Sequence, residues 1–83
     1  MKKIATFVFG FLLVCGTAYA SCITKAQAEA DALRAVGGGT VLLAVYEGGD
    51  YPPHWSVDVR LKNGTEDEVW VSCSGKILKI IRG

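Results

Sequence analysis

Histidine is almost absent from this chain of 83 residues, and cysteine is scarce: there is one histidine, His54, and there are three cysteines. A structural zinc site needs about four Cys or His ligands at paired spacings, and no CxxC or HxxxH occurs here. A nucleophile with its base would need partners that the spacing brings together, and no such set is visible. We therefore expect no metal, no cofactor and no catalytic residue, so the protein is predicted not to be an enzyme.

Clustered basic charge is also missing. Nine lysines and arginines stand against eight acidic residues, and loss of Lys2 and Lys3 with an N-terminal leader would leave seven against eight. Nucleic-acid binding calls for a clustered basic face, and a helix that lies on a membrane needs a basic polar side. Neither nucleic acid nor a membrane surface is thus an expected partner of the folded domain.

The first 20 residues show the three parts of a secretory signal peptide in the right order. Two lysines are followed by an uncharged apolar stretch, and Ala18 and Ala20 are the small residues expected before a cut after Ala20. We therefore divide the chain into a signal peptide, residues 1–20, and one domain of 63 residues, 21–83. The leader is of bacterial type and predicts a protein of the periplasm or the extracellular space, with no stable membrane insertion after cleavage.

Cys22 and Cys73 remain after such a cut. An even pair of cysteines in an exported protein indicates a disulfide, because the compartment is oxidising. The bridge would close a loop of about fifty residues and would stabilise the fold by about 4 kcal/mol. Other interpretations stay open, namely a lipid anchor on Cys22, an uncleaved leader that holds the protein at the membrane, free thiols, and a metal ligand.

The domain begins with a helical pattern and continues with strands. Residues 23–36 predict a helix with Thr24 as its N-cap and the glycines 37–39 as its end. Two stripes of apolar residues run along this helix, and their spacing does not decide which is buried: one is Ile23, Ala26, Ala30 and Leu33, and the other is Ala28, Ala32, Ala35 and Val36. Four strands follow, with a Gly- and Pro-rich loop after the first and an Asn-Gly hairpin after the second. The predicted strands are 41–46, 54–62, 66–73 and 76–82.

Short connections between strands imply antiparallel neighbours. The predicted fold is therefore α+β, with one N-terminal helix packed on a four-stranded antiparallel meander in the order α-β-β-β-β. A bridge from Cys22 to Cys73 would pin the start of the helix to the end of the third strand.

Strict alternation divides the second and third strands into an apolar face and a polar face. A tryptophan on the polar face is conspicuous, because aromatic anchors are enriched at binding sites. The partner-binding residues predicted on that face are Asp58, Arg60, Glu68 and Trp70. His54 is expected to be exposed beside them. The run Glu66–Glu68 is expected to be a solvated shoulder rather than a calcium site, because consecutive strand residues point to alternate faces.

Three segments, ITKAQAEADALRAVGGG, WSVDVRLKNG and EVWVSCSGKILKI, resemble a PepSY domain. The resemblance spans residues 23–82 and rests on core and turn positions. Ser72 departs from the pattern, since the family often has Asp there, and Glu29 and Asp31 occupy helix positions that are often apolar. The resemblance implies a helix packed on an antiparallel sheet and brings no catalytic residues.

The resemblance also implies a class of function. PepSY domains occur in the propeptides of secreted thermolysin-like metalloproteases, have been proposed to inhibit peptidases, and occur alone in small exported bacterial proteins. The chain is therefore predicted to be a non-catalytic exported binding module that docks on or inhibits a secreted or periplasmic peptidase. The alternative is a small structural or sensory envelope protein that binds a small ligand, with no peptidase involved.

Overall fold

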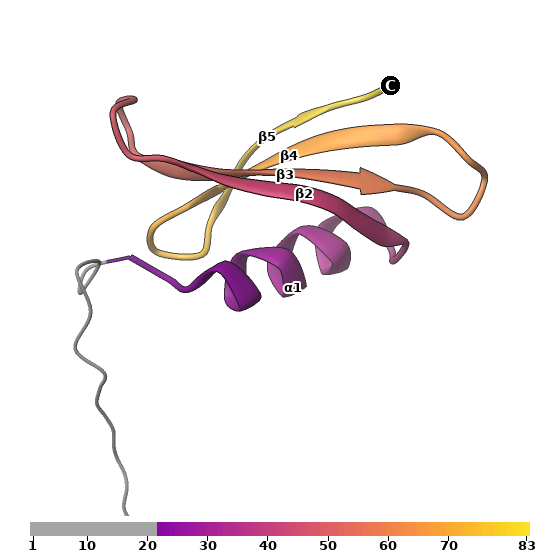
Figure 1. The fold of residues 1–83 in the computed structure, drawn as a ribbon, viewed down its shortest axis with the longest axis horizontal. Coiled ribbons are helices and arrows are strands. Elements are labelled where there is room, and N and C mark those ends of the chain that lie inside the picture. The colour runs from indigo at the N-terminus through magenta and orange to yellow at the C-terminus, as the bar shows by residue number, and fades with distance from the viewer. Residues whose placement is uncertain (1–21) are drawn as a thin grey trace, which may run out of the picture.

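A computed structural model describes residues 22–83 as one helix packed against one face of a four-stranded antiparallel sheet (Figure 1). The elements are α1 (Lys25–Val36), β2 (Thr40–Glu47), β3 (His54–Arg60), β4 (Glu66–Ser72) and β5 (Ile77–Ile81). The strands lie in the sheet in chain order, β2-β3-β4-β5. The predicted fold class is confirmed. The predicted signal peptide lies outside the described residues.

Helix α1 begins and ends where its sequence predicts. The Thr24 side chain accepts a hydrogen bond of 3.1 Å from the backbone N–H of Gln27, which satisfies one of the free donors of the first turn. Gly37 takes the left-handed conformation at the C-cap, with φ of 83°, and its N–H reaches back to carbonyls of the last turn. A side chain would strain this position, and glycine fits it without cost.

The helix buries the stripe that contains Ala28 and Ala32, both of which are fully inaccessible to solvent. Side chains of one methyl group let the helix backbone lie close to the sheet. On the sheet, alternate apolar residues of the two central strands pack against this stripe. These buried residues are Trp55, Val57 and Val59 of β3 and Val69 and Val71 of β4. The core thus lies between α1 and the middle of the sheet.

The segment before α1 is attached to the sheet at three points. Cys22 and Cys73 form a disulfide, which confirms the predicted pairing. The N–H of Ile23 donates to the carbonyl of Cys73 at 3.0 Å, and the indole Nε1 of Trp55 donates to the carbonyl of Ile23 at 3.1 Å. The helix start is therefore held at the end of β4, as the sequence predicts. Within residues 22–83, no helix combines the length and apolar character that crossing a bilayer requires.

Candidate functional site

The side of the sheet away from α1 is the candidate site, and we call it the outer face. Its residues follow from the register, since directly opposed residues of antiparallel strands point to the same side. From β2 and β3 they are Thr40, Leu43, Val45, Glu47, His54, Ser56, Asp58 and Arg60. From β4 and β5 they are Glu66, Glu68, Trp70, Ser72, Lys79 and Ile81. All four residues predicted to bind a partner lie on this face.

The indole of Trp70 is fixed from three directions. Its Nε1 donates a hydrogen bond of 2.7 Å to the Glu68 carboxylate. The ring of His54 stacks on it with 4.2 Å between centroids and 15° between planes. The ammonium of Lys79 lies 5.0 Å from the ring centroid, within the range of a cation–π contact. Trp70 is therefore half-buried, and these three contacts restrain the orientation of its indole.

Glu68 stabilises this arrangement as a carboxylate. The same oxygen, Oε2, accepts from Trp70 and, at 2.8 Å, from the hydroxyl of Ser56. The hydrogen bonds from Trp70 and then Ser56 lower the pKa of Glu68, and this effect outweighs the partial burial that opposes it. Glu68 is thus held in its charged form at the centre of the outer face.

Asp58 and Arg60 have different surroundings. Partial burial raises the pKa of Asp58, and repulsion from Glu68 and Glu66 raises it further. Arg60 donates to the Glu66 carboxylate at 3.2 Å, and both side chains of this pair are about half exposed. The four predicted residues are therefore brought onto one face, and two of them, Glu68 and Trp70, contact each other directly.

The prediction that His54 is exposed is wrong. Only 1% of the residue is accessible, because Trp70 covers its ring and the loop after β2 folds against it. Its Nδ1 lies 2.9 Å from the carbonyl of Pro52, and its Nε2 lies 3.9 Å from the Asp50 carboxylate without a hydrogen-bond partner. The loop therefore closes one end of the outer face.

The expectation that the run Glu66–Glu68 is solvated is wrong for its middle residue, Asp67. Asp67 is 3% exposed, because the C-terminal segment folds over it. Its carboxylate accepts from Arg82 Nη1 at 3.0 Å and from the N–H of Gly83 at 3.2 Å. A hollow of about 230 Å³ lies beside this acidic run, and the guanidinium of Arg82 already compensates the buried carboxylate in its wall. Within residues 22–83, no group of three or more His, Cys, Asp or Glu side chains is placed to hold a metal ion.

Sequence reasoning missed the exposed apolar side chains on the edge strands of the outer face and in the loop after β2. Leu43 and Val45 of β2 are 55% and 39% exposed, and Ile81 of β5 is 41% exposed. Tyr51, in the loop that covers His54, is 98% exposed. The register between strands would have identified Leu43, Val45 and Ile81, because each is paired with a residue on the polar face of β3 or β4. The sequence of β2 alone shows no alternation from which its two faces could be assigned.

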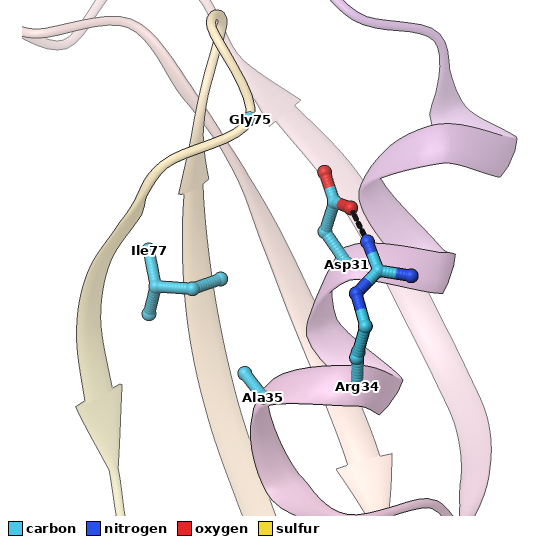
Figure 2. A pocket seen from close by; sticks show the side chains of 5 residues that line it. All are labelled: Asp31, Arg34, Ala35, Gly75 and Ile77. Carbon is cyan, nitrogen blue, oxygen red and sulfur yellow. Dashed lines mark hydrogen bonds and ion pairs between the residues drawn. The ribbon is translucent and has the colours of Figure 1, made fainter.

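A second hollow, of about 180 Å³, lies on the helix side of the sheet (Figure 2). Asp31 and Arg34 of α1 form an ion pair along its rim, and Gly75 and Ile77 close it from the other side. Binding pockets for small molecules usually enclose about 300–1,000 Å³. Both hollows are smaller than that, and the first belongs to the outer face itself, so the exposed surface of that face is a stronger candidate than either hollow.

A scan of protein-family models, a search of curated proteins and a search of solved structures each found no match to this chain. The resemblance to PepSY domains stays a prediction from the residues quoted above. Chemically, the outer face presents the indole of Trp70 held by three contacts, the carboxylate of Glu68 held in its charged form, and exposed aliphatic side chains on the edge strands.

Proposed function

We propose that the protein is an exported binding module without catalytic activity, and that a protein partner docks on the outer face. The observation that carries this proposal is the combination of an immobilised indole with exposed aliphatic groups at Leu43, Val45 and Ile81. The aliphatic groups lie on the two edge strands and flank the polar centre of the face, and aromatic side chains such as Trp70 are enriched at interaction sites. The disulfide supports export, because such bonds persist in oxidising compartments.

The rigid surroundings of Trp70 favour binding energetically. Association loses affinity when rotamer-rich side chains must be ordered, by about 0.5–1.5 kcal/mol for each. Glu68, His54 and Lys79 already restrict the indole. A partner that packs against Trp70 would therefore gain contact area with little further loss of side-chain entropy.

A catalytic role is not supported by the polar groups of this face. His54 is inaccessible beneath Trp70 and the loop, so it cannot reach a substrate. Ser56 donates to Glu68 rather than to a histidine. The base beside Ser56 is the Glu68 carboxylate, and a carboxylate whose pKa is lowered takes up a proton poorly at neutral pH.

The class of partner comes from the resemblance. A secreted or periplasmic peptidase is the first candidate, because PepSY domains accompany secreted metalloproteases. Docking of such an enzyme on the outer face would place the module either over its active site or beside it. Only the first arrangement inhibits peptide hydrolysis, so activity distinguishes the two.

The test is site-specific photocrosslinking in the protein's own host. A photoreactive residue replaces Ile81 on the outer face in one variant and Ala30 on the exposed side of α1 in the control. We expect one dominant adduct from position 81, its loss on Trp70→Ala substitution, and none from position 30. If the adduct is a peptidase, its activity should fall on titration and reach its minimum at one equivalent. Equal crosslinking from both positions, or no adduct from either, would contradict the proposal.

A further inference from the structure

Apart from a bulge near its start, the edge strand β2 lacks the features by which proteins usually protect a sheet edge. It lies at the end of the sheet order and is paired on one side only, with β3, among the described residues. Over its eight residues it has no proline and no charged side chain before Glu47. The opposite edge, β5, has five residues, includes Lys79 and is followed by Arg82. Short length and basic side chains are common devices against edge pairing, and β2 has neither.

A bulge near the start of β2 sets which residues share a face. Val41 pairs with Val59 and Leu43 pairs with Asp58, so Leu42 is an extra residue. The extra residue shifts the alternation by one position. Thr40, Leu43, Val45 and Glu47 consequently lie on the outer face, and Val41, Ala44 and Tyr46 lie on the side of α1.

This shifted pattern makes the strand complementary to itself. A second β2 can be placed antiparallel beside the first, with a twofold axis that is perpendicular to the sheet and passes midway between the two copies of Ala44. Leu43 then opposes Val45, the Val41–Leu42 pair opposes Tyr46, and Thr40 opposes Glu47. Every opposed pair lies on one side of the sheet, as antiparallel pairing requires. Without the bulge, Thr40 and Glu47 would point to opposite sides, because they are an odd number of residues apart.

Charge also favours this register. Glu47 is the one charged residue of β2, and in the pair it lies beside Thr40 of the other copy. Thr40 is itself paired with Arg60, whose side chain is 55% exposed on the same face. Two strand spacings separate Glu47 from that arginine, about 10 Å between Cα atoms, which two long side chains can span. The contact occurs twice by symmetry.

We propose that two copies of this protein pair along β2, antiparallel and centred on Ala44, to form a dimer with a continuous eight-stranded sheet. Both helices then lie on one side of the sheet, and both outer faces, each with its Trp70, lie on the other. The aliphatic groups at Leu43 and Val45 of the two copies join into one surface across the axis. The inference goes beyond the proposed function, because the outer face of a single copy could bind a partner without it.

Concentration-dependent sedimentation of the oxidised, purified protein tests the dimer. Two edge strands bury less than the roughly 1,600 Å² of a standard interface, so we expect dissociation in the range of about 5 to 500 μM. Leu42→Lys is the disruptive variant, and Leu78→Lys is its matched control, because these leucines of the two edge strands are 41% and 39% exposed. Leu42→Lys should raise the dissociation constant at least tenfold, and Leu78→Lys should change it less than twofold. Circular dichroism verifies that both variants are folded.

Cysteine crosslinking tests the register independently of affinity. Two copies of Ala44 should face each other with Cα atoms about 5 Å apart, within disulfide reach, so Ala44→Cys should form a covalent dimer on mild oxidation. Two copies of Val45 would be about 8 Å apart, so Val45→Cys should not. The native disulfide is verified by mass in both variants. A protein that stays monomeric at the highest concentration, disruption by Leu78→Lys but not Leu42→Lys, or equal crosslinking of both cysteine variants would overturn the proposal.

Discussion

The carboxylate of Glu68 accepts a hydrogen bond of 2.7 Å from the indole Nε1 of Trp70, two residues further along the same strand. Residues two apart on a strand share a face, so this contact forms within β4 without help from loops. Ser56, opposite Trp70 on β3, adds a second donor to the same oxygen. The carboxylate of Glu68 thus orients the indole of Trp70, and the hydrogen bonds from Trp70 and Ser56 in turn stabilise the charge on that carboxylate.

Replacing this acceptor should destabilise the protein in a pH-dependent way. Glu68→Gln removes the charge and weakens two hydrogen bonds, and we expect a loss of about 1 kcal/mol in the free energy of unfolding at neutral pH. The pKa of Glu68 is lowered by folding, so its contribution is present above the unfolded pKa and is lost as pH falls through the folded one. Urea unfolding should therefore separate wild type from variant at about pH 7 and much less at about pH 3.

Glu66→Gln is the matched control for that experiment. Glu66 lies on the same strand and face, but its ion pair with Arg60 is half exposed, and such pairs contribute roughly 0–1 kcal/mol. Its effect should be smaller than that of Glu68→Gln. Equal effects of the two substitutions would mean that the Trp70 contact does not stabilise the fold.

Asp58→Asn should change the free energy of unfolding at neutral pH in the opposite direction, so that the variant is more stable than wild type. Folding raises the pKa of Asp58 through partial burial and repulsion from Glu68 and Glu66. The contribution of such a group is favourable below its unfolded pKa and is lost as pH rises through its folded pKa. We expect the asparagine variant to be more stable than wild type at about pH 7, by a few tenths of a kcal/mol after solvent screening, and equal to it at about pH 3. Thermal unfolding at the two pH values measures this, and a destabilised variant at neutral pH would contradict it.

The elements with a clear local signal could be predicted from the sequence. β3 and β4 alternate strictly, and the Asn63-Gly64 turn between them has its glycine at φ of 93°. The Asn63 side chain accepts from the N–H of Thr65 at 3.0 Å, which stabilises this turn locally. Strand position, hairpin register and the polar face all follow from such short-range features. The predicted binding residues therefore lie together in the structure.

Residues whose burial depends on distant segments could not be predicted. His54 falls on the polar face of its strand by alternation, but Trp70 from the next strand and the loop before His54 remove it from solvent. Asp67 is covered by residues 82 and 83, fifteen or more positions further on. β2 reads as a uniform apolar run, so neither its exposed side chains nor the bulge at Leu42 was visible. Each case needs the register between strands, which one strand alone does not contain.

Close packing of α1 gives a third prediction. Ala28 and Ala32 are fully buried against the sheet, whereas Ala30 is exposed on the same helix. Ala28→Leu should cost about 1–3 kcal/mol, because extra methyl and methylene groups force the helix away from the valines of the core. Ala30→Leu has the same change in helix propensity and volume, and we expect it to be within about 0.5 kcal/mol of wild type. Chemical denaturation of the two variants under identical conditions compares them, and a stable Ala28→Leu protein would show that the helix does not pack this closely.

The disulfide between Cys22 and Cys73 gives the last prediction. It spans 51 positions of a small domain, and constraint of the unfolded chain should make it worth about 4 kcal/mol. A protein with both cysteines replaced by serine should unfold at markedly lower urea concentration with a similar or larger dependence on urea, since its unfolded state is less compact.

The exported form should begin at Ser21 and be lighter than the reduced chain by two hydrogens in an intact-mass measurement. A protein that begins at an acylated Cys22 would refute the signal-peptide prediction, and equal stability of the serine variant would mean that the bridge contributes nothing to the fold.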